Sequence, residues 1–437
     1  MKKVFAFIIA LCLATGVNAQ IDNLANLSPE WTRIGSRNAA TDAPDIMMYN
    51  PAGMVRLEAG LHIGIGNQSY FRKPSHKYDL GLGPATYQQD GNDLFVPNIN
   101  IGFTKDRWSV FGGAYIAGGG ATANYPSGSV NTDLIVGGFI PAFNALFMAD
   151  YTAGKDAYLK GNSYYLATSV GGAYALNERI SAGVSVRNLT ARSTTEAGFT
   201  LAGSASGLAP DMPLAVSTKD NASGMGIVAG MHAKINGKFN LSFRYESKVT
   251  LEFETTVEKD EPGLFTDGAK FRRDLPSVTA VGISYQATEK LKVMSDMNYY
   301  FQKNADWGPV EIEHPDYAGT ELAEMAGNAY TLSLGFEYAA NESLVLSLGG
   351  VYSVNDIADR EAYYTHLGAF ETIMETNFTL CTGFALSLSE KVRLNMGLFH
   401  AFYPDQTVKA LYYLPYDVDV KIKNSITSVG IGVNFKI

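Results

Sequence analysis

The chain has 437 residues, and its 34 Lys and Arg against 43 Asp and Glu give a formal net charge of −9. Because no basic excess is available to neutralise phosphates, nucleic acid is not an expected partner. Apolar residues make up 46% of the chain, which excludes disorder as the main state, and two cysteines cannot form a disulfide scaffold. A mean hydropathy of −0.03 argues against a bundle of membrane-spanning helices.

Residues 1–19 have the pattern of a cleaved signal peptide. Lys2 and Lys3 form a short basic start, an apolar run covers residues 4–13, and Val17 and Ala19 place small residues before the cleavage point. An uncleaved membrane anchor is the alternative, but this run is shorter than the roughly 20 residues that a spanning helix needs. The sequence therefore predicts export, with Cys381 as the single cysteine of the mature chain.

Beyond residue 58 the dominant pattern is alternation of apolar and polar residues, the period of a β-strand. Residues 328–340 place large apolar side chains on one face and small or polar ones on the other, and the last ten residues of the chain do the same. The apolar faces carry no Asp, Glu, Lys or Arg. One side of each strand is therefore expected to contact an apolar phase.

The connections between these strands alternate in length. Short turns such as 236–238 separate long polar connections near 72–96, 118–161, 190–222, 254–275, 303–327, 353–375 and 401–424. Short turns at one end and long loops at the other are typical of outer-membrane barrels. Residues 59–437 are therefore predicted to form an all-β fold, an antiparallel transmembrane β-barrel of about fourteen strands. The alternative, a soluble β-sandwich or propeller, does not require this alternation of lengths.

Residues 20–58 do not alternate. A segment of this length before a barrel is either a periplasmic tail or a plug folded into the lumen. Its apolar residues, among them Trp31, Ile34 and Met47, favour a packed plug.

Two motifs in this segment resemble the hatch of FadL-type transporters: residues 36–40 (SRNAA) and residues 49–54 (YNPAGM). The matching motifs are confined to about residues 33–57. The resemblance implies a fourteen-stranded barrel that takes long-chain fatty acids and aromatic hydrocarbons across the outer membrane. Asn50, Pro51 and Ala52 are the predicted plug motif, because proline fixes the turn and asparagine can bond nearby backbone. An ordinary turn into the first strand is the alternative.

The same resemblance implies a kinked third strand that opens the wall sideways. We expect the third strand over residues 108–117, and Gly112 and Gly113 are its candidate kink, since glycines inside strands mark bulges and bends.

Residues 134–148 form an unusually apolar stretch inside an expected outer loop. Its length of fifteen residues and the presence of Pro141 predict that it is too short to span a membrane as a helix. An exposed apolar surface of this size suggests an interaction site. The candidate residues for first capture of a ligand are Leu134, Ile135, Phe139, Phe143 and Phe147. The alternative is a loop that packs its own small core.

Three arginines have the parity of lumen-facing residues: Arg187, Arg244 and Arg393. A cation in an apolar pocket could pair with a fatty-acid carboxylate. The alternative is that Glu246 or Asp296 balances these charges. The sequence holds no HExxH, CxxC or GxSxG motif, so we expect no enzyme activity, no cofactor and no metal site.

The predicted function is passive uptake of hydrophobic small molecules with lateral release through the barrel wall. This route avoids exposing an alkyl chain to water, at about 0.8 kcal/mol per CH₂. The alternative is a general diffusion porin for polar solutes. The expected location is the bacterial outer membrane. The expected partners are outer-membrane lipids, lipopolysaccharide and the barrel-assembly machinery, and the protein is expected to be a monomer.

Overall fold

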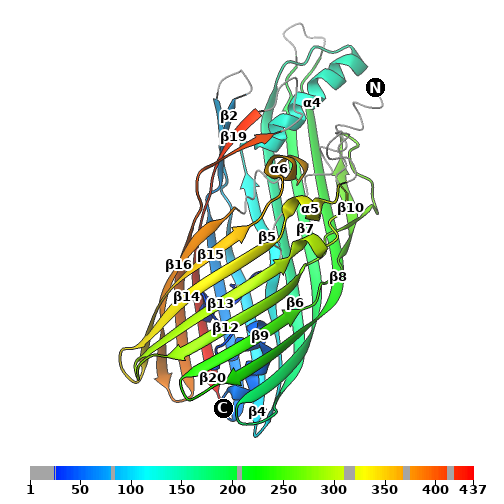
Figure 1. The fold of residues 1–437 in the computed structure, drawn as a ribbon. Helices are drawn as coiled ribbons and strands as arrows, with labels where there is room; N and C mark the ends of the chain where they lie inside the picture. Colours follow the sequence, from blue (N-terminus) through cyan, green and yellow to red (C-terminus); the bar gives the residue numbers. More distant parts are fainter. Residues whose placement is uncertain are drawn as a thin grey trace.

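A computed structural model of the chain describes Leu24 and residues 26–79, 84–203, 209–309, 320–367, 375–410 and 418–437. Its main body is a closed antiparallel barrel of fourteen strands (Figure 1), which confirms the predicted fold class. The strands are β1 (Gly60–Arg72), β4 (Asn92–Lys105), β5 (Trp108–Tyr125), β6 (Gly154–Ala175), β7 (Ile180–Leu201), β8 (Met212–Lys234), β9 (Phe239–Glu246), β12 (Ser277–Gln286), β13 (Leu291–Phe301), β14 (Ala329–Ala339), β15 (Leu344–Asn355), β16 (Asn377–Ser389), β17 (Val392–Phe402) and β20 (Ser425–Lys436). Pairing of β1 with β20 closes the barrel between its first and last strands, so the backbone groups along these two edges are hydrogen-bonded to each other.

The remaining strands, and the helices that follow β5 in the chain, lie in the long connections at one end of the barrel (Figure 1). We call this the loop end, and the opposite end, with the short turns, the turn end. A second sheet in the order β18-β19-β2-β3 and a strand pair beside β8 belong to the loop end. The elements are β2 (Ser75–Asp79), β3 (Pro84–Gln88), β10 (Glu252–Asp260), β11 (Lys270–Arg272), β18 (Gln406–Ala410), β19 (Val418–Lys423), α4 (Val130–Phe147), η2 (Gln302–Asn304), α5 (Leu322–Ala326) and α6 (Arg360–Leu367).

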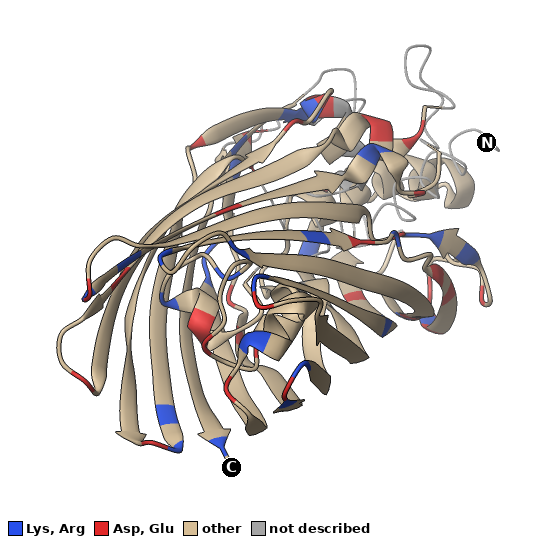
Figure 2. Cartoon of the chain, turned by 60° about the horizontal axis from the view of Figure 1, so that its bottom comes forward, with Lys and Arg blue, Asp and Glu red and all other residues tan. Residues whose placement is uncertain are grey.

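The two faces of the barrel wall differ as the alternation predicts. In β14, Leu334 points outward and is 48% exposed, whereas the neighbouring Ser333 points into the barrel and is 7% exposed. Charged residues are sparse along the middle of most strands and more frequent near the strand ends (Figure 2). A belt of apolar side chains therefore surrounds the barrel where a bilayer would contact it.

Several strands are longer than the sequence predicts. β6 and β7 have 22 residues each and β8 has 23, so strands occupy much of the connections expected at 118–161 and 190–222. Twenty-two residues of strand span roughly 70 Å, more than twice the hydrocarbon thickness. The prediction placed these strand ends too early because apolar side chains mark only the lipid-facing part. Backbone pairing continues beyond it, from Asn188↔Met225 to Leu201↔Met212.

The N-terminal segment lies inside the barrel. It forms α2 (Pro29–Thr32), α3 (Ile46–Tyr49) and the 3₁₀ helix η1 (Pro51–Arg56). Ile34, Ile46 and Met54 are fully buried there. The segment is therefore a plug and not a tail. The predicted signal peptide, residues 1–19, lies outside the described residues, and the plug boundaries at 20 and 58 stay predictions.

Candidate functional site

Glycines on the inner face of the wall let the plug backbone approach closely. A Cβ added to Gly397 would lie 2.6 Å from the Arg33 nitrogen, and one added to Gly383 would lie 2.7 Å from the Arg33 Cβ. Either side chain would push the plug from the wall. Other wall glycines hold the plug at similarly close range: Gly64, Gly66, Gly102, Gly183, Gly230, Gly282, Gly335, Gly349, Gly430 and Gly432.

Asn50, Pro51 and Ala52 fasten the plug to β7 and β8. The Asn50 side-chain oxygen accepts from the Ala52 N–H at 3.1 Å and so caps η1, while its amide nitrogen donates to the Met231 carbonyl at 3.0 Å. Ser181 donates to the Ala52 carbonyl at 2.9 Å. Pro51 is the first residue of η1, where its missing N–H is not needed. The motif thus lies where the plug and the wall meet.

A buried ion network lies inside the plug. Arg37 makes a two-pronged contact with Asp45, at 2.5 and 3.0 Å, and a third with Asp42 at 2.8 Å. Burial by itself would raise the pKa of Asp42, but the surrounding cations, Arg37 foremost, hold that pKa well below its usual value. The Asp42 carboxylate is therefore charged when the plug is seated.

Further contacts join this network to the wall. Arg33 Nη1 lies 2.5 Å from Glu337 of β14, and Lys292 of β13 pairs with the same carboxylate. Asp296, also on β13, accepts from the backbone N–H groups of Arg37 and Asn38 at 2.6 and 2.9 Å. These contacts fix one side of the plug, whereas the Asn50 motif fixes the other.

The three arginines proposed for ligand binding already have acidic neighbours. Arg187 Nη1 lies 2.7 Å from Glu246, and Arg244 Nε lies 3.3 Å from the same carboxylate. Arg393 lies 3.7 Å from Asp42 of the plug. Arg187 and Arg244 thus share one acidic partner, Glu246, which the sequence had offered as the alternative to a ligand carboxylate. A role for any of the three in holding a ligand carboxylate stays a prediction.

The wall is interrupted between β4 and β5. Their pairing runs from Lys105↔Trp108 to Asn98↔Tyr115 and ends there. Beyond this point the ladder of β5 continues with β6, with register shifts between Ile116 and Gly118 and between Gly118 and Ala121. The neighbouring strands β4 and β5 therefore stop pairing partway along their length, on the side toward the loop end.

This irregularity does not lie at Gly112 and Gly113. Both glycines are in register with β4 and β6, and the register shifts of β5 lie at residues 116–121. Gly119 there has a φ of +102°, which glycine adopts without strain. Gly113 instead leaves room for the plug, since an added Cβ would lie 3.1 Å from the Met47 methyl group.

The interruption is lined by main chain and apolar groups. On the β4 side, Pro97 has no N–H to pair, and Phe95 is 77% exposed. On the β5 side, the Ala117 carbonyl accepts from the Leu24 N–H of the plug at 2.9 Å. Toward the loop end, the Thr122 hydroxyl of β5 donates to the Asp93 carboxylate of β4 at 2.6 Å, and this contact marks the end of the interruption.

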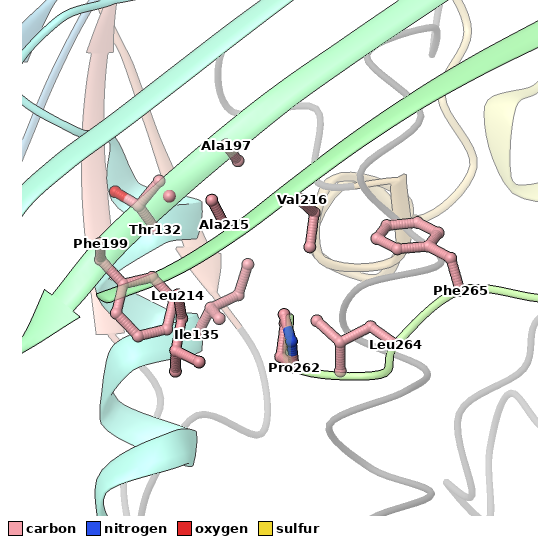
Figure 3. Close-up of a pocket in the computed structure, with 11 residues that line it drawn as sticks. Thr132, Ile135, Ala197, Phe199, Leu214, Ala215, Val216, Pro262, Leu264 and Phe265 are labelled. Atoms are coloured by element: carbon pink, nitrogen blue, oxygen red, sulfur yellow. The ribbon is translucent and has the colours of Figure 1, made fainter. Parts of the chain in front are cut away.

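A second feature is an apolar pocket at the loop end (Figure 3). It holds about 400 Å³ of space, including its open mouth. Its walls come from α4, the outer parts of β7 and β8, and the chain after β10, with these lining residues: Thr132, Ile135, Ala197, Gly198, Phe199, Leu214, Ala215, Val216, Pro262, Leu264 and Phe265. Apart from the Thr132 hydroxyl, the labelled side chains are hydrocarbon (Figure 3).

The apolar stretch predicted for ligand capture is helix α4 beside this pocket. Ile135 lines the pocket, Phe139 packs on Phe199 with ring centres 5.7 Å apart, and Phe147 is 57% exposed. Phe143 lies between Phe139 and Phe147, with its ring tilted against both at centre-to-centre distances of 5.4 Å. The helix thus forms a small core and also borders the pocket. The side chain of Leu134 is outside the described part of the structure.

Pro141 lies inside this helix, which continues to Phe147. α4 has 18 residues. By length and composition, it is the one helix in the described part of the chain that could cross a membrane. It lies at the loop end of the barrel (Figure 1). Sequence reasoning missed Thr132 and the residues that β7, β8 and the chain after β10 contribute to the pocket. The apolar pair Leu264-Phe265 in a polar loop was the only available signal.

A closed barrel with an apolar exterior and a lumen filled by its own N-terminal segment defines a plugged transmembrane barrel. No protein-family model matches the sequence, and no curated protein sequence is detectably similar. Solved structures share the fold. A Pseudomonas aeruginosa FadL homologue has a TM-score of 0.66 at 12% identity, covering 95% of this chain and 99% of that one. The toluene transporters TbuX of Ralstonia pickettii and TodX of Pseudomonas putida have TM-scores of 0.59 and 0.60 at 15% and 13% identity, and each covers 96% of this chain. TbuX is covered over 99% of its own length and TodX over 100%. The fold is that of FadL-type barrels.

Proposed function

We propose that this protein takes up hydrophobic small molecules through the bacterial outer membrane and releases them sideways through the wall. The observation that carries the proposal is the end of the β4–β5 pairing at Asn98↔Tyr115 while both strands continue. A barrel whose wall is interrupted while its lumen is plugged favours exit toward lipid over exit into the periplasm. Solved structures with this fold include transporters of toluene.

The pocket at the loop end supports entry of uncharged ligands. Its lining contains no charged side chain, so a carboxylate placed there would lose its hydration without a partner. Aromatic rings of Phe199 and Phe265 face the same space as Ile135 (Figure 3). We infer that hydrocarbons, or the alkyl part of an amphipathic molecule, bind here first.

The inner face of β7 leads from this pocket toward the plug. Ala191 and Leu189 lie on the same inward face of β7 as Phe199. They belong to one buried apolar cluster with Tyr165 and Phe253. Tyr115, on β5 at the start of the wall interruption, belongs to that cluster too. These five residues carry no charge and form an apolar patch between the pocket and the exit, with the small polar residues Ser193 and Thr195 separating this patch from Phe199 on the same face of β7.

A reversible cross-link tests the exit. Asp93 and Thr122 touch across the interruption, so Asp93→Cys with Thr122→Cys, in a chain carrying Cys381→Ala, should form a disulfide that holds β4 against β5. We expect oxidation to slow uptake of a hydrophobic substrate such as toluene, and a reducing agent to restore it.

The matched control is Ser69→Cys with Val429→Cys, a directly opposed pair on β1 and β20 where the wall is continuous. Its oxidation should leave uptake unchanged. If a verified cross-link at residues 93 and 122 also leaves uptake unchanged, lateral exit between β4 and β5 is wrong.

A further inference from the structure

Four lysines gather on the outward face of the loop end, where β1 continues into β2 and β19 continues into β20. Lys77 of β2 lies directly opposite Lys421 of β19, and Lys423 lies opposite Ser75. Lys73 is joined to the same ladder by a hydrogen bond from its N–H to the Ser425 carbonyl. All four side chains are exposed. We call this set, Lys73, Lys77, Lys421 and Lys423, the lysine face.

The charges of the lysine face are mostly unbalanced. Lys423 pairs with Asp405 at 2.7 Å, but within the described residues no carboxylate lies within 4.0 Å of the Lys73, Lys77 or Lys421 amines. Asp79 and Asp419 follow one step further out on the same two strands, and Asp419 is opposite Lys409. Like charges directly opposed across a strand pair destabilise the sheet, so Lys77 and Lys421 oppose stability in the absence of an anion.

The position of the lysine face relative to the bilayer follows from the residues below it. On the same outward face, nearer the turn end, lie Phe71 of β1 and Phe402 of β17, and nearer still lie Ile65 and Ile431. Apolar residues followed by an aromatic belt mark the outer boundary of the hydrocarbon layer. Lys73 lies one step beyond Phe71 along the outward face, Lys423 two steps, and Lys77 and Lys421 three steps, so the lysine face lies on the head-group side of the aromatic residues.

We propose that the lysine face binds the phosphate groups of a phosphorylated glycolipid of the outer leaflet, lipopolysaccharide, whose acyl chains pack on Phe71 and Phe402. The Cβ atoms of directly opposed residues are about 5 Å apart, so the Lys77 and Lys421 amines can share one phosphate. Lys73 and Lys423 flank that pair. This proposal requires a barrel embedded in the membrane but does not depend on which molecules the protein transports.

The experiment measures binding of purified lipopolysaccharide to the full-length protein in detergent by native mass spectrometry. Lys77→Gln with Lys421→Gln removes both amines that would share the phosphate, so it should weaken binding at least tenfold. Lys77→Arg with Lys421→Arg should bind like the wild type. The matched control is Lys155→Gln with Lys270→Gln, exposed lysines of the loop end that pair with Asp211 and Glu252, and it should also bind like the wild type.

Dephosphorylated lipopolysaccharide identifies the group that is recognised. We expect the wild-type protein to bind it as weakly as the Gln variant binds the intact lipid. Equal binding of intact and dephosphorylated lipid would overturn the proposal, as would wild-type affinity in the Gln variant. Equal binding of an acidic polysaccharide without lipid would assign the lysine face to a different partner, and it too would overturn the proposal.

Discussion

Arg33 of the plug and Glu337 of β14 form an ion pair 2.5 Å long, with both side chains buried inside the barrel. They are separated by most of the chain in sequence, so the contact forms only when the barrel has closed around the plug. It joins the Arg37–Asp42–Asp45 network to the wall. The seated plug is therefore held by charge on this side and by the Asn50 turn on the other.

Removing one partner of this pair should cost stability. Glu337→Ala leaves Arg33 buried and Lys292 without its carboxylate, and we expect the free energy of unfolding to fall by about 3–5 kcal/mol. Equilibrium unfolding in detergent measures it. The control is Glu342→Ala in the short turn after β14, where the side chain is exposed and little change is expected. Equal losses in the two variants would show that the pair does not hold the plug.

Replacing a wall glycine that touches the plug by a larger residue should open the channel to ions. Gly397→Val would place a side chain against the Arg33 backbone, so we expect the plug to shift while the barrel still assembles. Planar-bilayer conductance should rise above that of the wild type. Gly237→Val, in a turn with open space around it, is the matched control and should stay closed.

Deleting residues 26–56 extends the same test, because it removes the described plug without touching β1. We expect liposomes carrying this variant to swell in polar sugars and liposomes carrying the wild type not to swell. A wild-type protein that already admits sugars freely would favour the general diffusion porin.

The lipid-facing side of β14 gives a third prediction. Leu334→Arg places a charge in the apolar belt and should lower the free energy of unfolding by about 2–4 kcal/mol. Glu289→Arg, in the exposed turn between β12 and β13, should change it by less than about 0.5 kcal/mol. Ser333→Arg, the inward neighbour, is not neutral in this fold because Ser333 lies 2.6 Å from Ser36 of the plug. A stable Leu334→Arg variant would contradict a membrane-embedded barrel.

The loop-end sheet should weaken in acid through His76. This residue is fully buried in β2 and stacks on Tyr125, and burial lowers its pKa to about 3. Its unfolded pKa is about 6.5, so the stability that neutral His76 contributes is present above pH 6.5 and is lost as the pH falls toward 3. Hydrogen exchange of β2 and β19 should accelerate over this range. His76→Phe should remove the acceleration, and an unchanged pH profile in that variant would contradict the assignment.

Much of the architecture could be predicted from the sequence because it depends on periodicity. A lipid-facing residue such as Leu334 must be apolar and its neighbour Ser333 need not be, so alternation reports strands, faces and approximate strand number directly. The apolar residues of the plug, such as Ile34 and Met47, likewise show that the segment is packed, since water would penalise their exposure. The Asn50-Pro51-Ala52 turn is local chemistry and was readable for the same reason.

The contacts between residues distant in sequence were decided only by the tertiary structure. Glu246 pairs with both Arg187 and Arg244, Arg33 pairs with Glu337, and the register shifts of β5 lie at residues 116–121. None of these follows from spacing, because each depends on strand register and on how deeply the plug is seated. Period two fixes which face a side chain occupies, but the opposing partner depends on the closure of the barrel as a whole.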